Sequence, residues 1–297
     1  MLTISAGVCA YNEEMNILRC LRSLSSQRLD GKELIEVLVV SSGSTDRTDE
    51  IVQEYSRASD PRVRLIRQER REGKNSAVNA FIGEAKGEVL FLANADNVME
   101  EDTFDLMARH FMDPATGMVG GRPVPVNDRG TFMGFASHML WDMHHRLSLI
   151  HPKVGEIVAF RNTGLRIPTG MGSDEDLIRR EMESQGLRVL YEPSAIIHNR
   201  GPSTLADFFE QRTRVNIGER YMKRWFDYDI PTWDKRFLIN AWLSFLKDNA
   251  AHPLKMAGAM SIEAFARAYA SLHVRLDKGD RAIWQVVGST KDVQNRK

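Results

Sequence analysis

The sequence predicts an α/β fold in which a mostly parallel sheet is flanked by helices, and two observations lead to this prediction. Short apolar runs of β-like composition alternate with segments of helical periodicity over residues 1–111. Such alternation builds parallel sheets, because each helix carries the chain back to the same edge of the sheet. A chain of 297 residues is also long enough to bury a sizeable core.

Four β-like runs are expected, and each is followed by a helix. The runs are TISAGVCA (residues 3–10), IEVLVV (35–40), VRLIRQ (63–68) and EVLFLANA (88–95). The helical segments that follow them are residues 17–24, 46–57, 75–85 and 101–111. In the first helical segment, Ile17, Leu21 and Leu24 share one face, which is typical of a helix that covers a sheet.

The composition narrows the class of protein. The 40 basic and 40 acidic residues give no net charge, so no overall positive field draws the chain to nucleic acid. Two cysteines do not suggest a disulfide framework, and the first residues, MLTISAGVCAYNEE, lack the pattern of a secretion signal. No apolar run approaches the roughly 20 residues needed to cross a bilayer. We therefore expect a cytoplasmic protein without a spanning helix.

The loops at the carboxyl ends of the predicted strands are the candidate ligand site, because ligands of parallel sheets bind there. Polar groups that suit a phosphorylated ligand occupy residues 11–14, 41–46 and 94–97. The segment REGKN adds Arg71 and Lys74, which either hold a phosphate or form a solvated basic loop.

Two acidic segments stand out. Asp96 ends a buried apolar run, where it either binds a divalent cation or caps an Asx turn. SDEDL places Asp174, Glu175 and Asp176 side by side. This triplet is most simply the first turn of a helix capped by Ser173, since the helix dipole favours acidic residues there. Taken alone, neither segment identifies an active site.

In their order along the chain, these motifs resemble a known family. CAYNEE, VSSGSTDRT, REGKNSAVN and FLANADN are similar to the nucleotide-sugar-binding segments of the inverting glycosyltransferases of family 2, which have the GT-A fold. The resemblance continues through GEIVAFR and SDEDL to GLRVLYEPSAIIHNRGPSTLADFFEQRTRVNIG. It implies a GT-A catalytic domain over residues 1–225, with nucleotide-sugar binding in 1–100 and acceptor binding and catalysis in 101–225. A helical extension would occupy 226–297.

The resemblance also implies a catalytic role for the acidic triplet. In relatives with a Thr-Glu-Asp-like triplet, the last residue supplies the catalytic base, and this position is Asp176 here, with Asp174 and Glu175 beside it. Transfer of a sugar to an alcohol requires a carboxylate that removes the proton of the alcohol. Clustered acids also raise one another's pKa, which suits a base.

A set of donor contacts is implied in the same way. Tyr11 and Glu13 resemble contacts to the base and ribose, Lys74 resembles a contact to the diphosphate, and Gln211 and Arg214 resemble the Gln-x-x-Arg-Trp element. Thr204 and Asp207 form a capping-box-like start for the helix that carries this element. The complete set implied for donor binding is Ala10, Tyr11, Glu13, Ser42, Asp46, Lys74, Asn94, Ala95, Asp96, Gln211 and Arg214.

The family uses Mn²⁺ or Mg²⁺, and the resemblance implies two metal ligands. Asp96 matches the last acid of the family's DxD motif. His198, in the segment IIHN, is similar to a histidine that completes the metal site in some relatives, and is equally well a structural histidine.

Three departures from the family pattern leave a rival open. Ser41 and Ser42 replace two aspartates, Asn94 replaces the first acid of DxD, and Val215 replaces a tryptophan. They put recognition of uracil in doubt, although we still favour a UDP-sugar over a GDP-sugar. The rival is a catalytically silent nucleotide-sugar-binding or scaffold protein. An oxidoreductase or a nucleotidylyltransferase fits less well, because AYNEE stands where each needs a glycine-rich loop.

The acceptor side of the sequence is less specific. Trp141, His144 and His145 either line an acceptor pocket or belong to a core helix. After Trp225, apolar and basic residues at helical spacing predict two short amphipathic helices, which cap the sheet, form a homodimer or lie on a bilayer. Resemblance to enzymes that glycosylate lipids favours a lipid-linked acceptor hydroxyl at the cytoplasmic membrane surface. A soluble sugar or small-molecule acceptor is the alternative.

Overall fold

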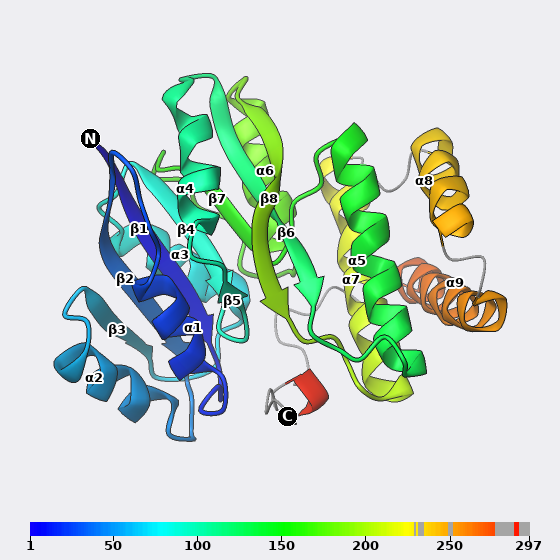
Figure 1. Cartoon of the computed structure of the whole chain (residues 1–297), viewed down its shortest axis with the longest axis horizontal. Helices are drawn as coiled ribbons and strands as arrows, with labels where there is room; N and C mark the ends of the chain where they lie inside the picture. Colours follow the sequence, from blue (N-terminus) through cyan, green and yellow to red (C-terminus); the bar gives the residue numbers. More distant parts are fainter. Residues whose placement is uncertain (229, 231–234, 249–251, 277–287, 291–297) are drawn as a thin grey trace.

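The computed structural model describes residues 1–228, 230, 235–248, 252–276 and 288–290. In this part of the chain one sheet carries helices on both faces, so the prediction of an α/β fold is confirmed (Figure 1). The strand order is β3-β2-β1-β4-β7-β6-β8-β5.

Parallel pairing builds the first half of the sheet. Its strands are β1 (Leu2–Ala10), β2 (Lys32–Ser42), β3 (Val63–Gln68) and β4 (Val89–Asn94). β1 pairs in parallel with both β2 and β4, and β2 pairs in parallel with β3. The connecting helices are α1 (Ile17–Ser25), α2 (Thr48–Ala58) and α3 (Lys74–Glu84). The predicted strands and helices of this half are confirmed, with ends that differ by a few residues.

The second half of the sheet is mixed. Its strands are β5 (Val98–Met99), β6 (Thr116–Pro125), β7 (Ile157–Arg161) and β8 (Arg188–Asn199). β7 runs antiparallel between β4 and β6, whereas β6 and β8 are parallel. β5 pairs antiparallel with β8. The predicted helix over residues 101–111 is shorter than expected, since α4 (Thr103–Ala108) passes into a 3₁₀ turn (Arg109–Met112).

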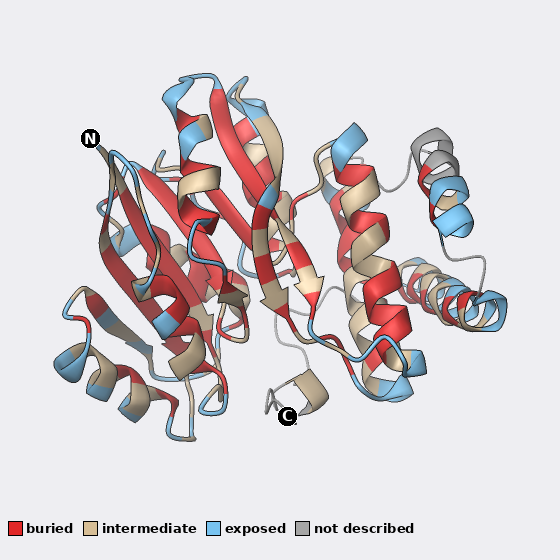
Figure 2. Cartoon of the chain, viewed as in Figure 1, coloured by how far each residue is buried: buried red, intermediate tan, exposed pale blue. Residues whose placement is uncertain are grey.

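Helices cover the two faces of the sheet in separate core layers. α1, α2 and α4 pack on one face, where the ring of Phe104 stacks on Phe91 of β4 with centroids 4.0 Å apart. α3 and α6 (Asp174–Ser184) pack on the other face. Phe81 of α3 lies directly on Gly7 of β1, where an added Cβ would come within 2.5 Å of the ring. Buried residues accordingly follow the strands and the inner sides of these helices (Figure 2).

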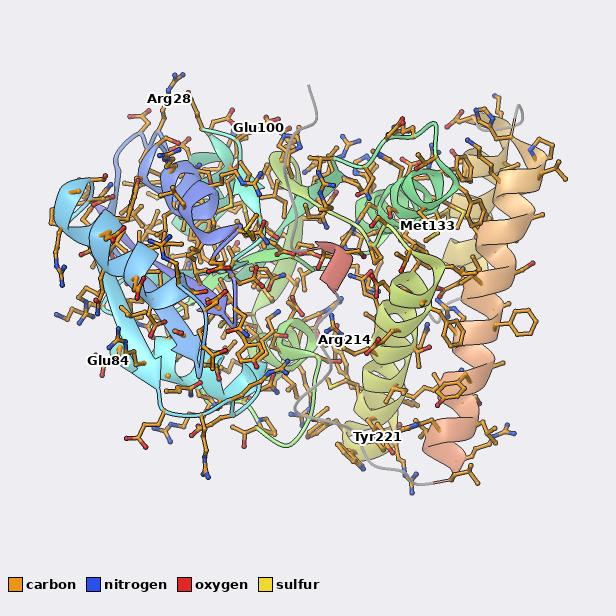
Figure 3. All side chains as sticks on the ribbon, turned by 90° about the horizontal axis from the view of Figure 1, so that it is seen from below. Arg28, Glu84, Glu100, Met133, Arg214 and Tyr221 are labelled. Atoms are coloured by element: carbon orange, nitrogen blue, oxygen red, sulfur yellow. The ribbon has the colours of Figure 1, made fainter. Side chains whose placement is uncertain are left out.

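A third group of helices stands beside the sheet. It consists of α5 (Phe132–Ile150), α7 (Leu205–Phe226), α8 (Lys235–Asp248) and α9 (Pro253–Arg275). Phe135, Phe208 and Phe245 share one apolar cluster there, and α7 lies between the sheet and α9 (Figure 3). The hydroxyl of Thr204 accepts a hydrogen bond from the Asp207 amide at the start of α7, as its sequence indicated.

The predicted C-terminal helical extension is confirmed by α8 and α9, but the expectation that both helices are short needs correction. α9 has 23 residues, and α7 continues to Phe226, through the predicted domain boundary. α9 then packs on α7, with Ala270 against Ile217 and Tyr221. The division into domains at residue 225 stays a prediction. Within the described ranges, no helix combines the length and the apolar character needed to cross a membrane.

Candidate active site

A cavity of about 660 Å³ lies at the carboxyl ends of β1, β2 and β4 and extends to α5, α7 and α9. The strand register brings these ends together, since Ala10 of β1 pairs with Ser41 of β2 and Cys9 of β1 pairs with Asn94 of β4. The cavity is therefore shared by the loops of the first half of the chain and by helices from the second half. Every predicted site residue lines it except Asp46 and His198.

Asp46 connects two loops beside the cavity. One carboxylate oxygen accepts a hydrogen bond from the Glu14 amide, and the other accepts from the amide and hydroxyl of Thr48. Asn12 reinforces this link, because its side-chain oxygen accepts from the Thr45 amide. Asp46 thereby fixes the loop after β1 against the start of α2. Its contact with a donor stays a prediction.

The loop after β3 closes over the end of β2. Gly43 has a positive φ of 69°, and an added Cβ would lie 2.6 Å from the Arg71 backbone nitrogen. The Ser42 hydroxyl accepts a hydrogen bond from the Glu72 amide. This approach places the Arg71 guanidinium 4.1 Å from the centre of the Tyr11 ring, and both side chains line the cavity. The result is a flat, cationic surface at the end of β1.

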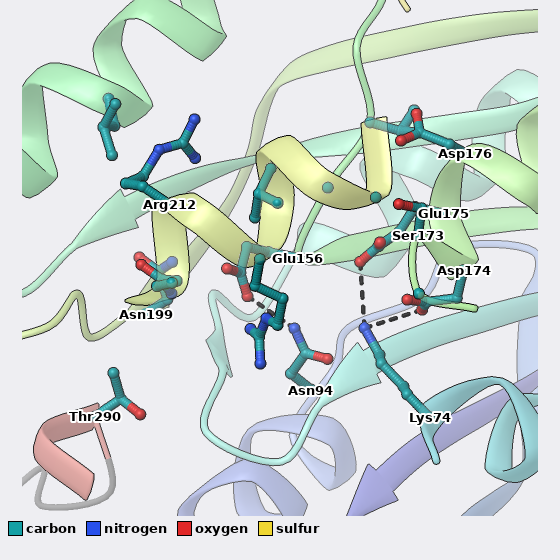
Figure 4. A pocket seen from close by; sticks show the side chains of 18 of the residues that line it. Lys74, Asn94, Glu156, Ser173, Asp174, Glu175, Asp176, Asn199, Arg212 and Thr290 are labelled. Carbon is teal, nitrogen blue, oxygen red and sulfur yellow. Dashed lines mark hydrogen bonds and ion pairs between the residues drawn. The ribbon is translucent and has the colours of Figure 1, made fainter. Parts of the chain in front are cut away.

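Lys74 joins the donor-side loops to the acidic triplet (Figure 4). Its Nζ lies 2.9 Å from Asp174 Oδ2 and 3.4 Å from Glu175 Oε1. Burial opposes its charge, but the carboxylates of Asp174 and Glu175 raise the pKa of Lys74 above the usual lysine range. Burial, assisted by Glu175 and opposed by Lys74, raises the pKa of Asp174 to about 6. For Glu175, burial opposes the charge, but the charge of Lys74 and hydrogen bonds to the carboxylate together lower the pKa.

The triplet opens α6, as predicted, but the expected cap is absent from this helix. Ser173 holds the N-cap position in a left-handed conformation (φ 65°, ψ 48°), and its side chain makes no capping hydrogen bond. A left-handed residue does not aim its hydroxyl at the helix amides in the usual capping geometry. The Ser173 hydroxyl instead lies against α7, since an added Cβ on Gly218 would lie 2.4 Å from Ser173 Oγ. The start of α6 is therefore held against the middle of α7.

Asp176 differs from its two neighbours in its surroundings. The ion pair of Lys153 Nζ and Glu219 Oε1, 3.1 Å apart, faces it from the loop before β7 and from α7. Burial raises the pKa of Asp176 to about 7, with Lys153 opposing the rise and Glu219 supporting it. The carboxylate therefore accepts a proton readily near neutral pH, which is the property required of a general base.

Asp96 presents a carboxylate to the cavity at the end of β4. Nearby, Asn94 Nδ2 donates to Glu156 Oε2 at 2.9 Å, and Glu156 is held at a positive φ of 63°. His198 lies on β8, outside the cavity lining, with Nε2 3.2 Å from Glu100 Oε1. Across the described residues, no group of three or more His, Cys, Asp or Glu side chains is placed to hold a metal. An open site still fits a cation that takes one or two carboxylates and completes its shell with substrate phosphates.

Sequence reasoning identified Gln211 and Arg214 of α7 but missed the other residues that α7, α8 and α9 contribute to the lining. Glu263 of α9 accepts from Arg212 at 2.7 and 3.1 Å and from Arg267 at 2.7 Å, and all three line the cavity. No local pattern indicates that α9 lies here. Arg212 follows Gln211, which the family resemblance did identify. Its place next to a predicted site residue was the one signal in the sequence that could have indicated Arg212.

Further residues that were not singled out are Lys153, Glu156, Arg200, Glu219 and Trp242. Of the three α5 residues considered for an acceptor pocket, Trp141 and His144 line the cavity. His145 instead hydrogen-bonds the Tyr191 hydroxyl at 2.9 Å.

The fold is an α/β fold of the GT-A type. Its parallel strands end at one cavity, which is lined by acidic loop residues and bordered by helices. The family model of glycosyl transferase family 2 matches residues 5–180, and the chain belongs to this family. The resemblance stated from the sequence motifs is therefore confirmed.

Solved structures share the fold. The mannosyltransferase PcManGT from Pyrobaculum calidifontis, in complex with GDP-Man and Mn²⁺, has a TM-score of 0.60 and 19% identity, with 99% of this chain and 88% of that chain covered. Residues 1–349 of Staphylococcus aureus TarS, in complex with UDP-GlcNAc, have a TM-score of 0.52 and 16% identity, with 93% and 92% covered.

Relatives with similar sequences support the same family. Poly-beta-1,6-N-acetyl-D-glucosamine synthase of Staphylococcus epidermidis is 26% identical over 225 residues, which is 71% of this chain and 53% of that protein. N-acetylglucosaminyltransferase of Rhizobium meliloti (strain 1021) is 25% identical over 233 residues, which is 70% of this chain and 53% of that protein. The chain thus spans about half the length of these two relatives.

Proposed function

We propose that this chain is an inverting glycosyltransferase that moves a sugar from a nucleotide-sugar donor to an acceptor hydroxyl. One observation carries the proposal: Asp176, with a pKa raised to about 7, lines the same cavity as the loops after β1 and β4. A base and a donor site must share one water-restricted space for such a transfer. A silent binding protein has no need of a carboxylate poised in this way.

The chemistry follows from the position of Asp176. Its carboxylate removes the proton of the acceptor hydroxyl, and the oxygen then attacks the anomeric carbon from the face opposite the diphosphate. The bond from that carbon to the diphosphate oxygen breaks, and the nucleoside diphosphate leaves with the bonding electrons. Asp176 keeps the proton until solvent removes it. Arg214 of α7, which lines the cavity, is proposed to stabilise the leaving diphosphate.

On the donor side, Tyr11 with Arg71 is proposed to hold the base, and Glu13 the ribose. Asp96 would hold a Mn²⁺ or Mg²⁺ ion, which would supply charge neutralisation at the diphosphate. PcManGT, with GDP-Man and Mn²⁺, and glucosyl-3-phosphoglycerate synthase from Mycobacterium tuberculosis, with UDP and Mn²⁺, share the fold and support a divalent cation at this kind of site. His198 of β8, which pairs with Val98 two residues after Asp96, would be its second ligand. These neighbours differ in their nucleotide, and a UDP-sugar stays the favoured donor.

The outer face of α9 supports a contact with the cytoplasmic membrane surface and a lipid-linked acceptor. Leu254, Phe265, Tyr269 and Leu272 are all at least 50% exposed. At about 100° per residue they fall within a 60° stripe of the helix. The charged residues of this helix at positions 263 and 267 instead face the cavity. A helix with apolar residues outside and charged residues inside suits an interfacial position.

Release of free nucleotide from a panel of UDP- and GDP-sugars, with Mn²⁺ or Mg²⁺ and with a chelator, tests the proposal and names the donor. Metal-stimulated release from one donor supports it. If no donor in the panel is hydrolysed or transferred while donor binding is measurable by calorimetry, the silent-binding alternative replaces it.

A further inference from the structure

One wall of the cavity is unsuited to a nucleotide sugar. The wall is formed by α5 and α8 and consists of Met139, Leu140, Met143, Leu147 and Trp242. Met139, Met143 and Leu147 belong to the apolar cluster beside the sheet, so this surface is a continuation of that core. A nucleotide sugar consists of a base, two sugars and a diphosphate and has no apolar segment to place against it. The wall is available to another molecule.

Arginines form the neighbouring wall. Arg200 follows β8, Arg212 lies on α7 and Arg267 lies on α9, and all three line the cavity. Glu263 neutralises one charge between Arg212 and Arg267, with N···O distances of 2.7 Å to each. The Nε atom of Arg200 is buried and has no hydrogen-bond partner within the described part of the chain. A buried guanidinium N–H without an acceptor is costly, unless a ligand anion completes it.

The arginine wall is separated from the proposed base along α7. Glu219, beside Asp176, lies seven residues after Arg212 on this helix. At 1.5 Å per residue, the separation along the helix axis is roughly 10 Å. An anion held by Arg200, Arg212 and Arg267 would therefore lie to one side of a hydroxyl at Asp176.

We propose that this half of the cavity is an acceptor subsite for an anionic amphiphile: a molecule with a phosphate or carboxylate group held by the arginine wall and an apolar segment on the α5–α8 wall. The inference rests on the proposed transferase function, and it specifies the class of acceptor. Phosphate and carboxylate both present two anionic oxygens that can accept a pair of parallel N–H bonds from a guanidinium group.

Three soluble probes separate the two requirements. Octyl phosphate is both anionic and apolar, inorganic phosphate is only anionic, and octyl β-glucoside is only apolar. Calorimetric titration of the full chain, below the micelle concentration of each amphiphile, is expected to give an affinity for octyl phosphate at least about tenfold higher than for either other probe. This factor corresponds to about 1.4 kcal/mol. Equal affinity for octyl phosphate and octyl β-glucoside would overturn the anionic subsite.

Two variants test which part of the ligand each wall binds. Arg200→Gln is expected to lower the affinities for octyl phosphate and for inorganic phosphate by about tenfold or more, because a charge-assisted hydrogen bond is lost. Trp242→Ala is expected to lower the affinity for octyl phosphate and to leave the affinity for inorganic phosphate unchanged. Arg188→Gln is the matched control, since Arg188 pairs with Asp113 on the surface, away from the cavity. Identical binding by Arg200→Gln, Arg188→Gln and the parent chain would refute the arginine wall.

The result is distinguishable from a failure of the transferase proposal. Donor turnover is measured separately, by nucleotide release with each probe absent. If octyl phosphate binds as expected and no nucleotide sugar is turned over, the transferase proposal and the acceptor role fail together, while the amphiphile site stands. If a donor is turned over and octyl phosphate does not bind, only the subsite is wrong.

Discussion

At the scale of single residues, the environment of a carboxylate decides its role. Asp174 and Glu175 both face Lys74 within 3.4 Å, whereas Asp176 faces the Lys153–Glu219 pair. Three neighbouring acids in the sequence thus receive different pKa values in the fold. The first two are linked to Lys74 of α3, and the third is the proposed base.

The substitution Asp176→Asn tests the proposed base. Donor affinity should be nearly unchanged, while the transfer rate should fall by about 100-fold or more, because no carboxylate accepts the acceptor proton. Single-turnover transfer and donor calorimetry on the purified variant measure the two quantities. Turnover within a few-fold of the parent chain would rule out Asp176 as the base.

The rate should also depend on pH with a definite sign. The base works only when deprotonated, and burial raises the pKa of Asp176 to about 7. We therefore expect kcat/KM to rise with pH through about 7 and to fall about tenfold for each pH unit below it. A profile from pH 5 to 9 checks this. A rate that is flat over this range would mean that another group controls the proton.

Asp96→Ala tests the metal proposal. Asp96 is the only acid in the segment NADN, so its loss should abolish the part of donor affinity that depends on a divalent cation. Calorimetry with Mn²⁺ and with chelator gives both affinities, and His198→Ala should show a smaller loss. Equal donor affinity with and without Mn²⁺ in the parent chain would contradict a metal role for either residue.

At the scale of elements, α7 connects the catalytic and C-terminal parts. Its face at Gly218 touches the start of α6, and its face at Arg212 bonds Glu263 of α9. Sequence reasoning found α7 and its capping Thr204 because helix starts have local signals. It missed the partner of Arg212, because an ion pair between residues 51 apart leaves no local trace.

Glu263→Gln should loosen this connection. Burial disfavours the charge of Glu263, but Arg212 and Arg267 lower its pKa to about 2. Because this folded-state pKa is depressed, the stabilisation is present above the unfolded pKa of about 4.5 and is lost as pH falls toward 2. At pH 7 we expect about 2 kcal/mol or more of lost unfolding free energy, since two guanidinium groups lose their charged partner.

Urea unfolding at pH 7 and at pH 3 measures this effect. The difference in unfolding free energy between the parent chain and Glu263→Gln should be smaller at pH 3 than at pH 7. Glu101→Gln is the control, because Glu101 pairs with Arg28 on the exposed surface and should change stability little. A pH-independent deficit would show that packing, not charge, is responsible.

At the scale of the whole molecule, the apolar stripe of α9 is the surface to test. Flotation of the full chain with anionic and neutral liposomes should show binding, stronger with anionic lipid. The double variant Phe265→Ser with Leu272→Ser should stay unbound. Met112→Ser is a control, because Met112 is 74% exposed on the 3₁₀ turn after α4, a different part of the surface. Recovery of the parent chain at the bottom of the gradient with both lipids would reject membrane contact.

The sequence by itself determined the four parallel strands, their helices and the loops that end them. Each depends on local periodicity, and parallel pairing then forces the loops to one edge. The motif order also determined the family and placed Asp176, Lys74 and Asp96 among the candidate residues.

Only the tertiary structure decided what surrounds those residues. The Lys153–Glu219 pair near Asp176 joins positions 66 apart, and the apolar wall joins α5 to Trp242 of α8. The cavity wall supplied by α9 was equally invisible in the sequence. Such contacts depend on how helices pack in three dimensions, and helical periodicity specifies which face of a helix is buried without specifying the surface that covers it.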